Sequence, residues 1–306
     1  MSFFLALDAG GTKTDYVLAD EIRELARVRT GTIKRMRTDA ATAAKNLEQA
    51  LTELSVRTGV SMQSVTRTCV GTAGETVSLV TDWLREAIIA RVAGELMVLG
   101  DVEIALDAAF PGQAGVLVLA GTGSNVAGRT AAGQLVSAGG WGPALADQGS
   151  GHRIGLEGLR AIFMAKDEGC TTQLLAEVLE FWQLDSVEAL VEYANKLPAP
   201  DFSQLTELVL RCAELGDAVA CAVLQKEGED LAYLARLVIR RLQAASAEQG
   251  WVPPIAFAGS IMDKVLPVRK ALIAAVRCEV PDIRVLDGVV DPIVGALWRA
   301  RMGGFS

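Results

Sequence analysis

The sequence predicts an α/β fold with two related halves and a mostly helical segment in the second half. Short apolar runs of strand length alternate with stretches of helical periodicity in the first half. Helical periodicity then continues almost unbroken from Gly155 to Gln249. A pattern of strand, glycine turn and strand occurs once in each half. Alternating strands and helices of this kind are typical of an α/β protein.

The strand signals are short apolar runs, each followed by Gly or Asp. They cover residues 3–7, 16–19, 65–70, 95–99, 115–120 and 255–258, and a further signal lies near 283–286. Helical patterns lie at 40–58 and 79–91, and a last helix is expected at 292–301. The first helix places Ala43, Leu47, Ala50, Leu51 and Leu54 on one stripe, so we expect it to pack by that face.

The segment from about 155 to 249 is predicted to be a helical insertion or subdomain. Its periodicity is broken at Gly169, at Pro198 and Pro200, and at Gly216. No low-complexity linker separates it from its surroundings. We therefore expect an N-terminal unit at 1–112 and a C-terminal unit at 113–306, and leave open whether the last helix packs back on the first unit.

Composition narrows the class of protein. With 306 residues, 51% apolar and 22% charged, the chain has ample core material for a soluble protein. A net charge of −8 argues against a nucleic-acid partner, and the apolar runs fall short of the about 18 residues that a membrane helix needs. The five cysteines form no C-x-x-C pair, which argues against a zinc site or a disulfide framework. We expect a reduced, cytoplasmic protein with a small-molecule partner.

The two glycine turns read DAGGTKT at 8–14 and GTGS at 121–124. Neither matches a P-loop or a dinucleotide-binding motif, because each leads into another strand instead of a helix. Ordinary β-hairpins would explain the glycines without any ligand. Two matched copies favour a second reading, in which backbone N–H groups and hydroxyls of both turns hold a polyphosphate.

Two aspartates stand where strands end. Asp8 ends the first strand beside its glycine turn, which suits a hard cation, although it could simply cap that turn. Asp101 follows the run that ends at Gly100 and opens a helical stretch, so capping that helix would also explain it. His152 is the only histidine, and we expect a surface or capping role for it.

Four motifs carry a resemblance to a known family. DAGGTKT, GTGSN, GGWGPALADQGSG and FAGS occur in this order over essentially the whole chain. The chain resembles the N-acetylglucosamine kinase and BadF/BadG-type branch of the superfamily that also holds actin and the sugar kinases. The resemblance implies a two-lobed actin-like ATPase fold of duplicated ribonuclease H-like domains. It also implies ATP-dependent phosphorylation of an amino sugar, with ATP and Mg²⁺ as cofactors.

The resemblance implies a role for each motif. Asp101 would be the general base that takes the proton from the sugar hydroxyl, and Asp8 would hold the metal ion. ATP would contact the two turns and the FAGS segment, through Gly10, Gly11, Thr12, Lys13, Thr14, Gly121, Thr122, Gly123, Ala258, Gly259 and Ser260. The sugar would contact Ser124, Asn125, Gly140, Trp141, Gly142 and Asp147. Asp147 could instead cap the helix that follows it.

Two departures from the family pattern bear on the sugar. Many relatives have an Asn shortly after the third strand, where this chain has Thr32 to Arg35 after Gly31. Relatives also often have Glu where this chain has Gln148. One negative charge fewer disfavours a cationic amino group, so we expect N-acetylglucosamine, phosphorylated at its 6-hydroxyl. Glucosamine kinase and an ATPase switch without a sugar remain alternatives, and a homodimer is allowed.

Overall fold

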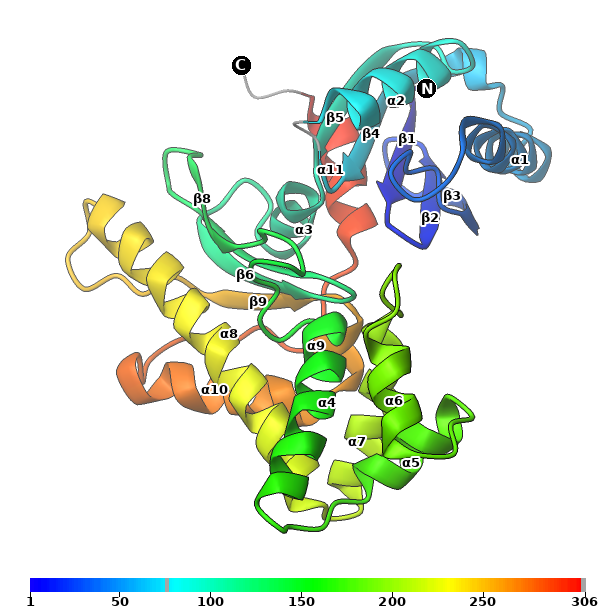
Figure 1. The fold of residues 1–306 in the computed structure, drawn as a ribbon. Helices are drawn as coiled ribbons and strands as arrows, with labels where there is room; N and C mark the ends of the chain where they lie inside the picture. The colour runs from blue at the N-terminus through cyan, green and yellow to red at the C-terminus, as the bar shows by residue number, and fades with distance from the viewer. Residues whose placement is uncertain (75–76, 304–306) are drawn as a thin grey trace. The chain divides into compact units, whose positions relative to one another are not determined.

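The computed structural model describes residues 1–74 and 77–303 and divides into two compact units. Unit 1 contains Met1–Gln113 and the C-terminal segment from Val290, and unit 2 contains Ala114–Val289. Figure 1 traces the chain through both units. Among the described residues, no helix is both long and apolar enough for a membrane crossing.

Unit 1 is built on a five-stranded sheet in the order β3-β2-β1-β4-β5. The strands are β1 (Phe3–Ala9), β2 (Lys13–Ala19), β3 (Glu24–Gly31), β4 (Val65–Thr72) and β5 (Glu95–Gly100). The helices are α1 (Ala40–Thr58), α2 (Ser78–Ile89), α3 (Asp101–Ala109) and α11 (Pro292–Met302), with a short 3₁₀ turn at Met62–Ser64. β1, β2 and β3 run antiparallel in sequence, whereas β1, β4 and β5 are parallel.

Alternate residues of β1 face two different cores, as the period of two in a strand requires. Leu5 and Leu7 pack with α1 and α2, and Phe4 and Ala6 pack with α3 and α11. Asp8 has the parity of Phe4 and Ala6 and therefore stands on the face covered by α3 and α11. This alternation determines which charged groups surround Asp8.

The last helix, α11, belongs to unit 1. Its Ile293, Ala296, Leu297 and Ala300 are buried against β1, β2, β4 and α3. The C-terminal unit expected at 113–306 therefore ends at Val289, because α11 buries its apolar face on the first sheet. The first boundary lies at Gln113, one residue after the expected position.

Unit 2 has a four-stranded sheet in the order β8-β7-β6-β9. Its strands are β6 (Gly115–Ala120), β7 (Ser124–Arg129), β8 (Leu135–Gly139) and β9 (Ile255–Ala258). Its helices are α4 (Gly151–Asp167), α5 (Leu174–Phe181), α6 (Val187–Ala194), α7 (Thr206–Glu214), α8 (Ala218–Ala245), α9 (Ser260–Lys264) and α10 (Leu266–Glu279), with a 3₁₀ turn at Phe202–Leu205. In Figure 1, the long helix α8 lies beside α10.

The two sheets repeat one arrangement. β1 and β6 are each antiparallel to the strand that follows the glycine turn, and each is parallel to a strand reached later in the chain, β4 or β9. The order β3-β2-β1-β4 thus corresponds to β8-β7-β6-β9. The predicted repeat of strand, turn and strand is present in both units.

Helices fill the segment in which helical periodicity was continuous. α4 ends just before Gly169, prolines 198 and 200 follow α6, and Gly216 separates α7 from α8. That this segment is an insertion relative to other members of the fold stays a prediction. The signal near 283–286 forms no strand, and only an isolated bridge joins Val285 to Ile255.

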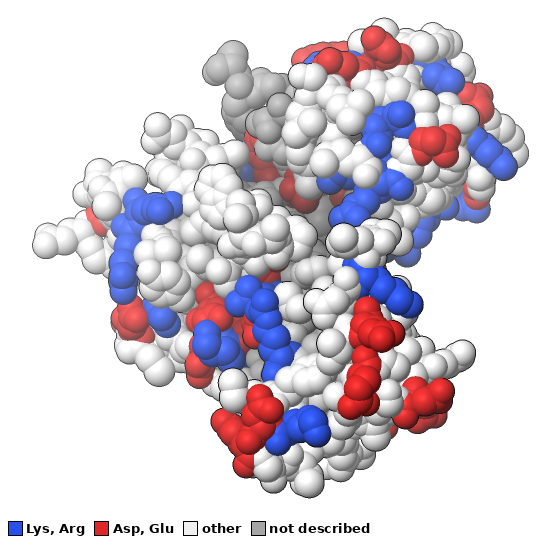
Figure 2. Space-filling model, in the orientation of Figure 1, with Lys and Arg blue, Asp and Glu red and all other residues white. Residues whose placement is uncertain are grey.

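Charged side chains are interspersed on the visible face of unit 2. Figure 2 shows Lys and Arg next to Asp and Glu on this face, with no surface of one sign. Several charged side chains of unit 2 pair within or between helices, such as Arg160 with Glu157 and Arg240 with Glu279. Exposed pairs of this kind contribute about 0–1 kcal/mol each.

Candidate active site

Asp8 lies at the carboxyl end of β1 beside three other carboxylates. In the sheet, Asp8 pairs with Asp15 of β2, and both residues face α3 and α11. These helices begin at Asp101 and directly after Asp291, their first residue and N-cap respectively. The sheet register and two helix starts therefore gather four acids on one face of unit 1.

Burial, together with the charges of Asp101, Asp15 and Asp291, raises the pKa of Asp8 to about 7, while Lys13 opposes the shift. Asp15 is balanced locally, because its carboxylate accepts a hydrogen bond from Arg29 at 2.6 Å. Asp291 likewise accepts from Arg27 at 2.6 Å. Asp15 and Asp291 are thus each paired with an arginine of β3.

Asp101 is held at the same edge of the sheet as Asp8. The register runs from Asp8 through Gly71 of β4 to Leu99 of β5, and Asp101 follows two residues later. Gly100 is the N-cap of α3, and the Asp101 carboxylate accepts the N–H of Val102 at 2.8 Å. A Cβ at Gly71 would overlap the side chain of Ile104, so this glycine allows α3 to pack closely on β4.

The first glycine turn, between β1 and β2, is stabilised by a hydrogen bond from the segment after β3, and that segment by one from α1. The hydroxyl of Thr32 donates to the carbonyl of Gly10 at 2.7 Å, and Asn46 of α1 donates to the carbonyl of Thr32 at 2.9 Å. Gly11, Thr12 and Lys13 are exposed. Thr14 is fully buried, and its hydroxyl accepts the N–H of Ile33 at 3.2 Å, so its side chain serves the local structure.

The donor set around Asp8 fits a magnesium ion. Carboxylate oxygens are hard ligands, and Mg²⁺ is usually held by one or two carboxylates together with water and substrate phosphates. Among the described residues, no group of three or more His, Cys, Asp or Glu is placed so that it could hold a metal ion by itself. A half-buried carboxylate in a negative potential matches the kind of site that shares its ion with phosphate oxygens.

In unit 2, the second glycine turn meets the FAGS segment. Gly259, at the end of β9, has φ of +91° and approaches the backbone of Ala120 so closely that a Cβ would overlap the Ala120 carbonyl. The position of a Cβ on Gly121 lies 3.8 Å from the Ser260 hydroxyl oxygen. Ala258 pairs with Leu119 in the sheet. These predicted ATP-binding residues of unit 2 are thus brought together.

The turn at 147–150 packs on the second glycine turn. The Ser124 hydroxyl donates to the carbonyl of Gln148 at 2.7 Å, and a Cβ on Gly123 would lie 3.2 Å from Asp147 Oδ2. Asp147 is buried in the left-handed region, with φ of +66°. Burial raises its pKa, against the opposing effect of the N–H groups of Ser124 and Gly142 and of His152. Ser150, not Asp147, is the N-cap of α4.

Asn125 and Gly140 lie against each other across β7 and the end of β8. Gly140 has φ of +74°, and a Cβ there would lie 2.9 Å from Asn125 Cγ. The Asn125 Oδ1 atom is buried with no hydrogen-bond partner among the described residues. Trp141 and Leu145 are exposed, at 76% and 81%, and the carbonyl of Gly142 accepts the N–H of Ala146 at 2.9 Å. An unsatisfied amide oxygen next to the loop that carries an exposed indole suits a sugar.

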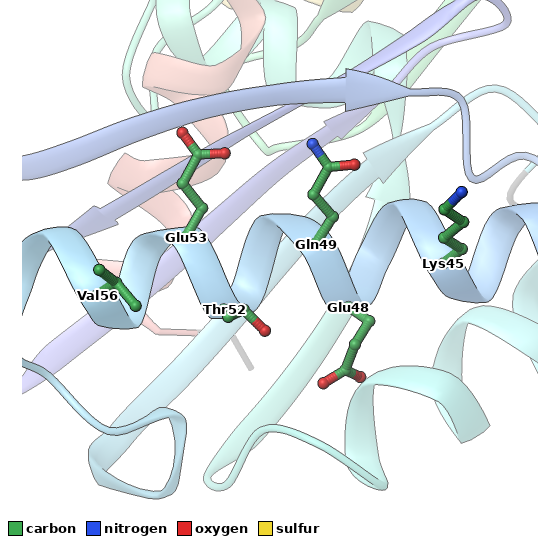
Figure 3. A pocket seen from close by; sticks show the side chains of 6 residues that line it. All are labelled: Lys45, Glu48, Gln49, Thr52, Glu53 and Val56. Carbon is green, nitrogen blue, oxygen red and sulfur yellow. The ribbon is translucent and has the colours of Figure 1, made fainter.

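A depression on the outer side of α1 does not resemble a ligand site. Figure 3 shows its side chains, which come from successive turns of this single helix and do not converge on one point. They are Lys45, Glu48, Gln49, Thr52, Glu53 and Val56. None of the predicted site residues lines it.

The structure adds residues that the sequence patterns did not single out. Asp15 and Asp291 contribute to the potential at Asp8, and Glu227 of α8 accepts the N–H of Gly149 at 2.6 Å. Asp291 had a local signal, since an acid before a proline is typical of a helix start. His152, expected to be a surface or capping residue, lies in the first turn of α4, and its ring makes an edge-to-face contact with Phe202.

The chain matches the sequence profile of the BadF/BadG/BcrA/BcrD ATPase family over residues 5–300. The chain belongs to this family. The match covers both units and every predicted site residue, and it confirms the family that the four motifs indicated.

Two curated relatives are similar to this chain over nearly its whole length. The N-acetylmuramic acid/N-acetylglucosamine kinase of Clostridium acetobutylicum is 25% identical, over 98% of this chain and 99% of the relative. The N-acetyl-D-glucosamine kinase of Dictyostelium discoideum is 29% identical, over 96% of each chain.

Solved structures confirm the fold class. A Chromobacterium violaceum protein proposed to be an N-acetylglucosamine kinase aligns with a TM-score of 0.74 and 25% identity, over 97% of this chain and 98% of its own. A ROK family glucokinase from Streptomyces griseus, in complex with glucose and AMPPNP, aligns with a TM-score of 0.59 over 99% and 100% of the two chains. At 17% identity, the second likeness concerns the fold alone. The predicted actin-like α/β fold is confirmed.

Proposed function

We propose that this protein is an ATP-dependent kinase that phosphorylates N-acetylglucosamine at its 6-hydroxyl. The observation that carries the proposal is the pair Asp8 and Asp101, on one face and at one edge of the first sheet, in a member of an ATPase family. Phosphoryl transfer needs charge stabilisation and a positioned base more than covalent chemistry. Both curated relatives are kinases of N-acetylglucosamine, which supports this sugar.

In the proposed reaction, Asp101 accepts the proton of the sugar 6-hydroxyl through its carboxylate. The sugar oxygen then forms its bond to the γ-phosphorus of ATP, and the bond from that phosphorus to the β–γ bridging oxygen breaks as ADP leaves. Asp8 would hold Mg²⁺, which when bound neutralises charge on the phosphates. Thr12 and Thr122 would donate their hydroxyls to phosphate oxygens, alongside the N–H groups of the glycine turns.

Unit 2 would supply most of the sugar contacts. The buried Asn125 Oδ1 lacks a partner among the described residues, so a sugar hydroxyl could satisfy it. Gly140 permits the close approach of the loop to Asn125, and Trp141 offers an apolar face. Asp147 would accept a sugar hydroxyl, while Ser124 and Gly142 hold its carboxylate in place. An acetamido group matches this mixture better than a cationic amine, because Gln148 adds no negative charge.

A second substrate is favoured by the segment after β3. Where relatives often have Asn, this chain carries Lys34, Arg35 and Arg37 within four residues. Arg37 lies against the first glycine turn, with its Nε 3.8 Å from the position of a Cβ on Gly11. Three cations in a chain of net charge −8 suit an amino sugar that bears a carboxylate. The Clostridium relative is named a kinase of such a sugar, N-acetylmuramic acid.

The test is ADP formation by purified protein with ATP and Mg²⁺, measured with and without each sugar. The proposal expects ADP formation to depend on N-acetylglucosamine and to yield its 6-phosphate, identified by ³¹P nuclear magnetic resonance. Equal ADP formation without any sugar would instead favour an ATPase switch. Stimulation by N-acetylmuramic acid that is lost on Arg37→Ala would support the second substrate.

A further inference from the structure

Glu227 is a buried carboxylate directly beneath the turn that carries Asp147. It lies within α8 and is only 1% exposed. Its Oε2 accepts the N–H of Gly149 at 2.6 Å, and its Oε1 lies 3.5 Å from Nε of Arg153 in α4. Arg153 also pairs with Glu157 of α4 at 3.0 Å. Glu227 thus connects the long helix α8 to the turn and to the first turn of α4.

The packing leaves Glu227 in a fixed position relative to the turn. Gly149 has φ of +71°, and a Cβ there would overlap the side chain of Leu231, one turn further along α8. At the next residue of α8, a Cβ on Gly228 would lie 2.5 Å from the carbonyl oxygen of Val268 and 2.6 Å from the Cβ of Ala271 in α10. α8 therefore packs closely against both the turn and α10, so the Glu227 carboxylate has little freedom to move away.

The turn that Glu227 holds is hydrogen-bonded to predicted ligand-binding residues. Two residues before Gly149, Asp147 takes an unfavourable positive φ. Two residues after it, the N–H of Gly151 donates to the carbonyl of Gly121 at 2.8 Å. The Ser124 hydroxyl holds the carbonyl of Gln148 between them. The conformation at Asp147 thus depends on hydrogen bonds made by the residues that follow it in the turn. Among these, the hydrogen bond of the Gly149 N–H is the one accepted by a charged side chain, that of Glu227.

A buried carboxylate is costly unless it is hydrogen-bonded and paired. A neutral acceptor or a backbone carbonyl would satisfy the Gly149 N–H with less desolvation. A charged acceptor gives a shorter and stronger hydrogen bond, which resists the strain of a non-glycine residue at positive φ nearby. The use of a charged acceptor for the Gly149 N–H is therefore explained if the orientation of the turn has a function.

We propose that Glu227 is a positioning residue for the amino sugar, because it fixes the 147–150 turn so that Asp147 and Gln148 present a preformed surface to the substrate. The inference rests on the proposed function, since it takes the sugar as the ligand of this turn. It assigns Glu227 no contact with substrate. Its effect is exerted through the N–H of Gly149.

The test compares Glu227→Ala and Glu227→Gln. The alanine variant leaves the Gly149 N–H without its acceptor, whereas the glutamine Oε1 can still accept it. Loss of such a buried contact is expected to raise KM for N-acetylglucosamine about tenfold in the alanine variant. KM for ATP is expected to change less than about twofold, because the β6–β7 hairpin is held by its own sheet pairing. The glutamine variant is expected to recover most of the sugar affinity.

Asp217→Ala is the matched control. Asp217 is another buried acid at α8, where it caps the helix by accepting the N–H of Ala220 at 2.9 Å, and it also accepts the N–H of Gln173 at 2.6 Å. Its loss is expected to lower the midpoint of thermal unfolding and leave KM for the sugar unchanged. General weakening of unit 2 would instead shift KM in both alanine variants.

Hydrogen exchange of the peptide that spans residues 143–152 gives a readout that needs no activity. Faster exchange in Glu227→Ala, with protection kept in Glu227→Gln, is expected in the protein without ligands. Unchanged exchange in Glu227→Ala, or equal changes of KM for sugar and ATP, would overturn the inference. If the wild-type protein phosphorylates no sugar while exchange changes as expected, the proposed function fails and Glu227 keeps only its role in shaping the turn.

Discussion

Asp8 and Asp101 lie at one edge of the same sheet but in different surroundings. Asp8 is half-buried, and desolvation together with the charges of the neighbouring acids raises its pKa to about 7, which favours a cation beside it. Asp101 is half-buried at the start of a helix, where its carboxylate accepts the N–H of Val102. The proposed function assigns them two roles, metal ligand for Asp8 and base for Asp101.

Replacing the base tests this division of roles. Asp101→Asn keeps the size of the side chain and an acceptor for the Val102 N–H, so folding and ATP binding should persist. Turnover should fall by at least about a hundredfold, the lower end of general-base contributions. Steady-state kinetics and ATP titration measure the two effects. A variant with near-full turnover would remove Asp101 from the mechanism.

Thr12 and Thr122, one in each glycine turn, are exposed, as a role in binding phosphate requires. Thr12→Val and Thr122→Val each remove one donor and keep the shape of the side chain. Each substitution should raise KM for ATP about tenfold, since a hydrogen bond to a charged group contributes about 1.5–3 kcal/mol. KM for the sugar should change little. If only KM for the sugar rises, the turns bind the sugar and not the nucleotide.

Local sequence identified the acids and hydroxyls at strand ends, because those positions follow from strand length and turn chemistry. It did not identify Asp15, whose place in a strand gave no sign that register would pair it with Asp8. It also could not identify Glu227, because the partner of Glu227 lies 78 residues away along the chain. Contacts between distant residues set the electrostatics of the candidate site, and a single sequence does not encode them locally.

At the scale of elements, helix α3 is held in place from two sides. On the sheet side, the Ile104 side chain of α3 packs against Gly71 of β4. At the other contact, Gly295 of α11 packs on the backbone of α3, and a Cβ on Gly295 would overlap the Ile104 carbonyl. Arg299 of α11 donates to the buried Asp107 of α3 at 2.6 Å and pairs with Glu103 at 3.2 Å. These contacts fix the helix that begins with Asp101.

Gly295→Ala should therefore affect both stability and activity. Overpacking at this contact is expected to lower the free energy of unfolding by about 1–3 kcal/mol. The neighbouring Val294 is half exposed, and Val294→Ala should change the free energy by less than about 0.5 kcal/mol. Chemical denaturation measures both values. Equal stabilities of the two variants would contradict the close α3–α11 packing.

Elements with complete local signals were predicted well. The helix expected at 40–58 is α1, with Asp39 as its N-cap, Gly59 in the left-handed region as its C-cap, and the predicted stripe buried. Neither β3 nor β8 gave a strand signal of its own, and a third strand ending at Gly31 was expected only from the family resemblance. Both are edge strands with many exposed or half-exposed residues, so their patterns lack a continuous apolar run.

At the scale of the whole molecule, the repeat of strand, turn and strand was visible in the sequence and recurs in both sheets. The place of α11 was not predictable from its own residues, because an amphipathic helix does not specify which apolar surface it covers. Its burial in unit 1 makes that unit discontinuous in sequence. Both ends of the chain therefore contribute to the unit that holds Asp8 and Asp101.

The most direct test of the central claim is kcat/KM at saturating ATP for N-acetylglucosamine, glucosamine, N-acetylmuramic acid and glucose. The account predicts that the acetylated amino sugar is preferred to glucosamine and to glucose, since a site with an unsatisfied Asn125 oxygen and an apolar Trp141 face suits an acetamido sugar. A preference for glucosamine of about tenfold, or about 1.4 kcal/mol, would contradict the choice of sugar. Turnover of none of these sugars would contradict the kinase assignment itself.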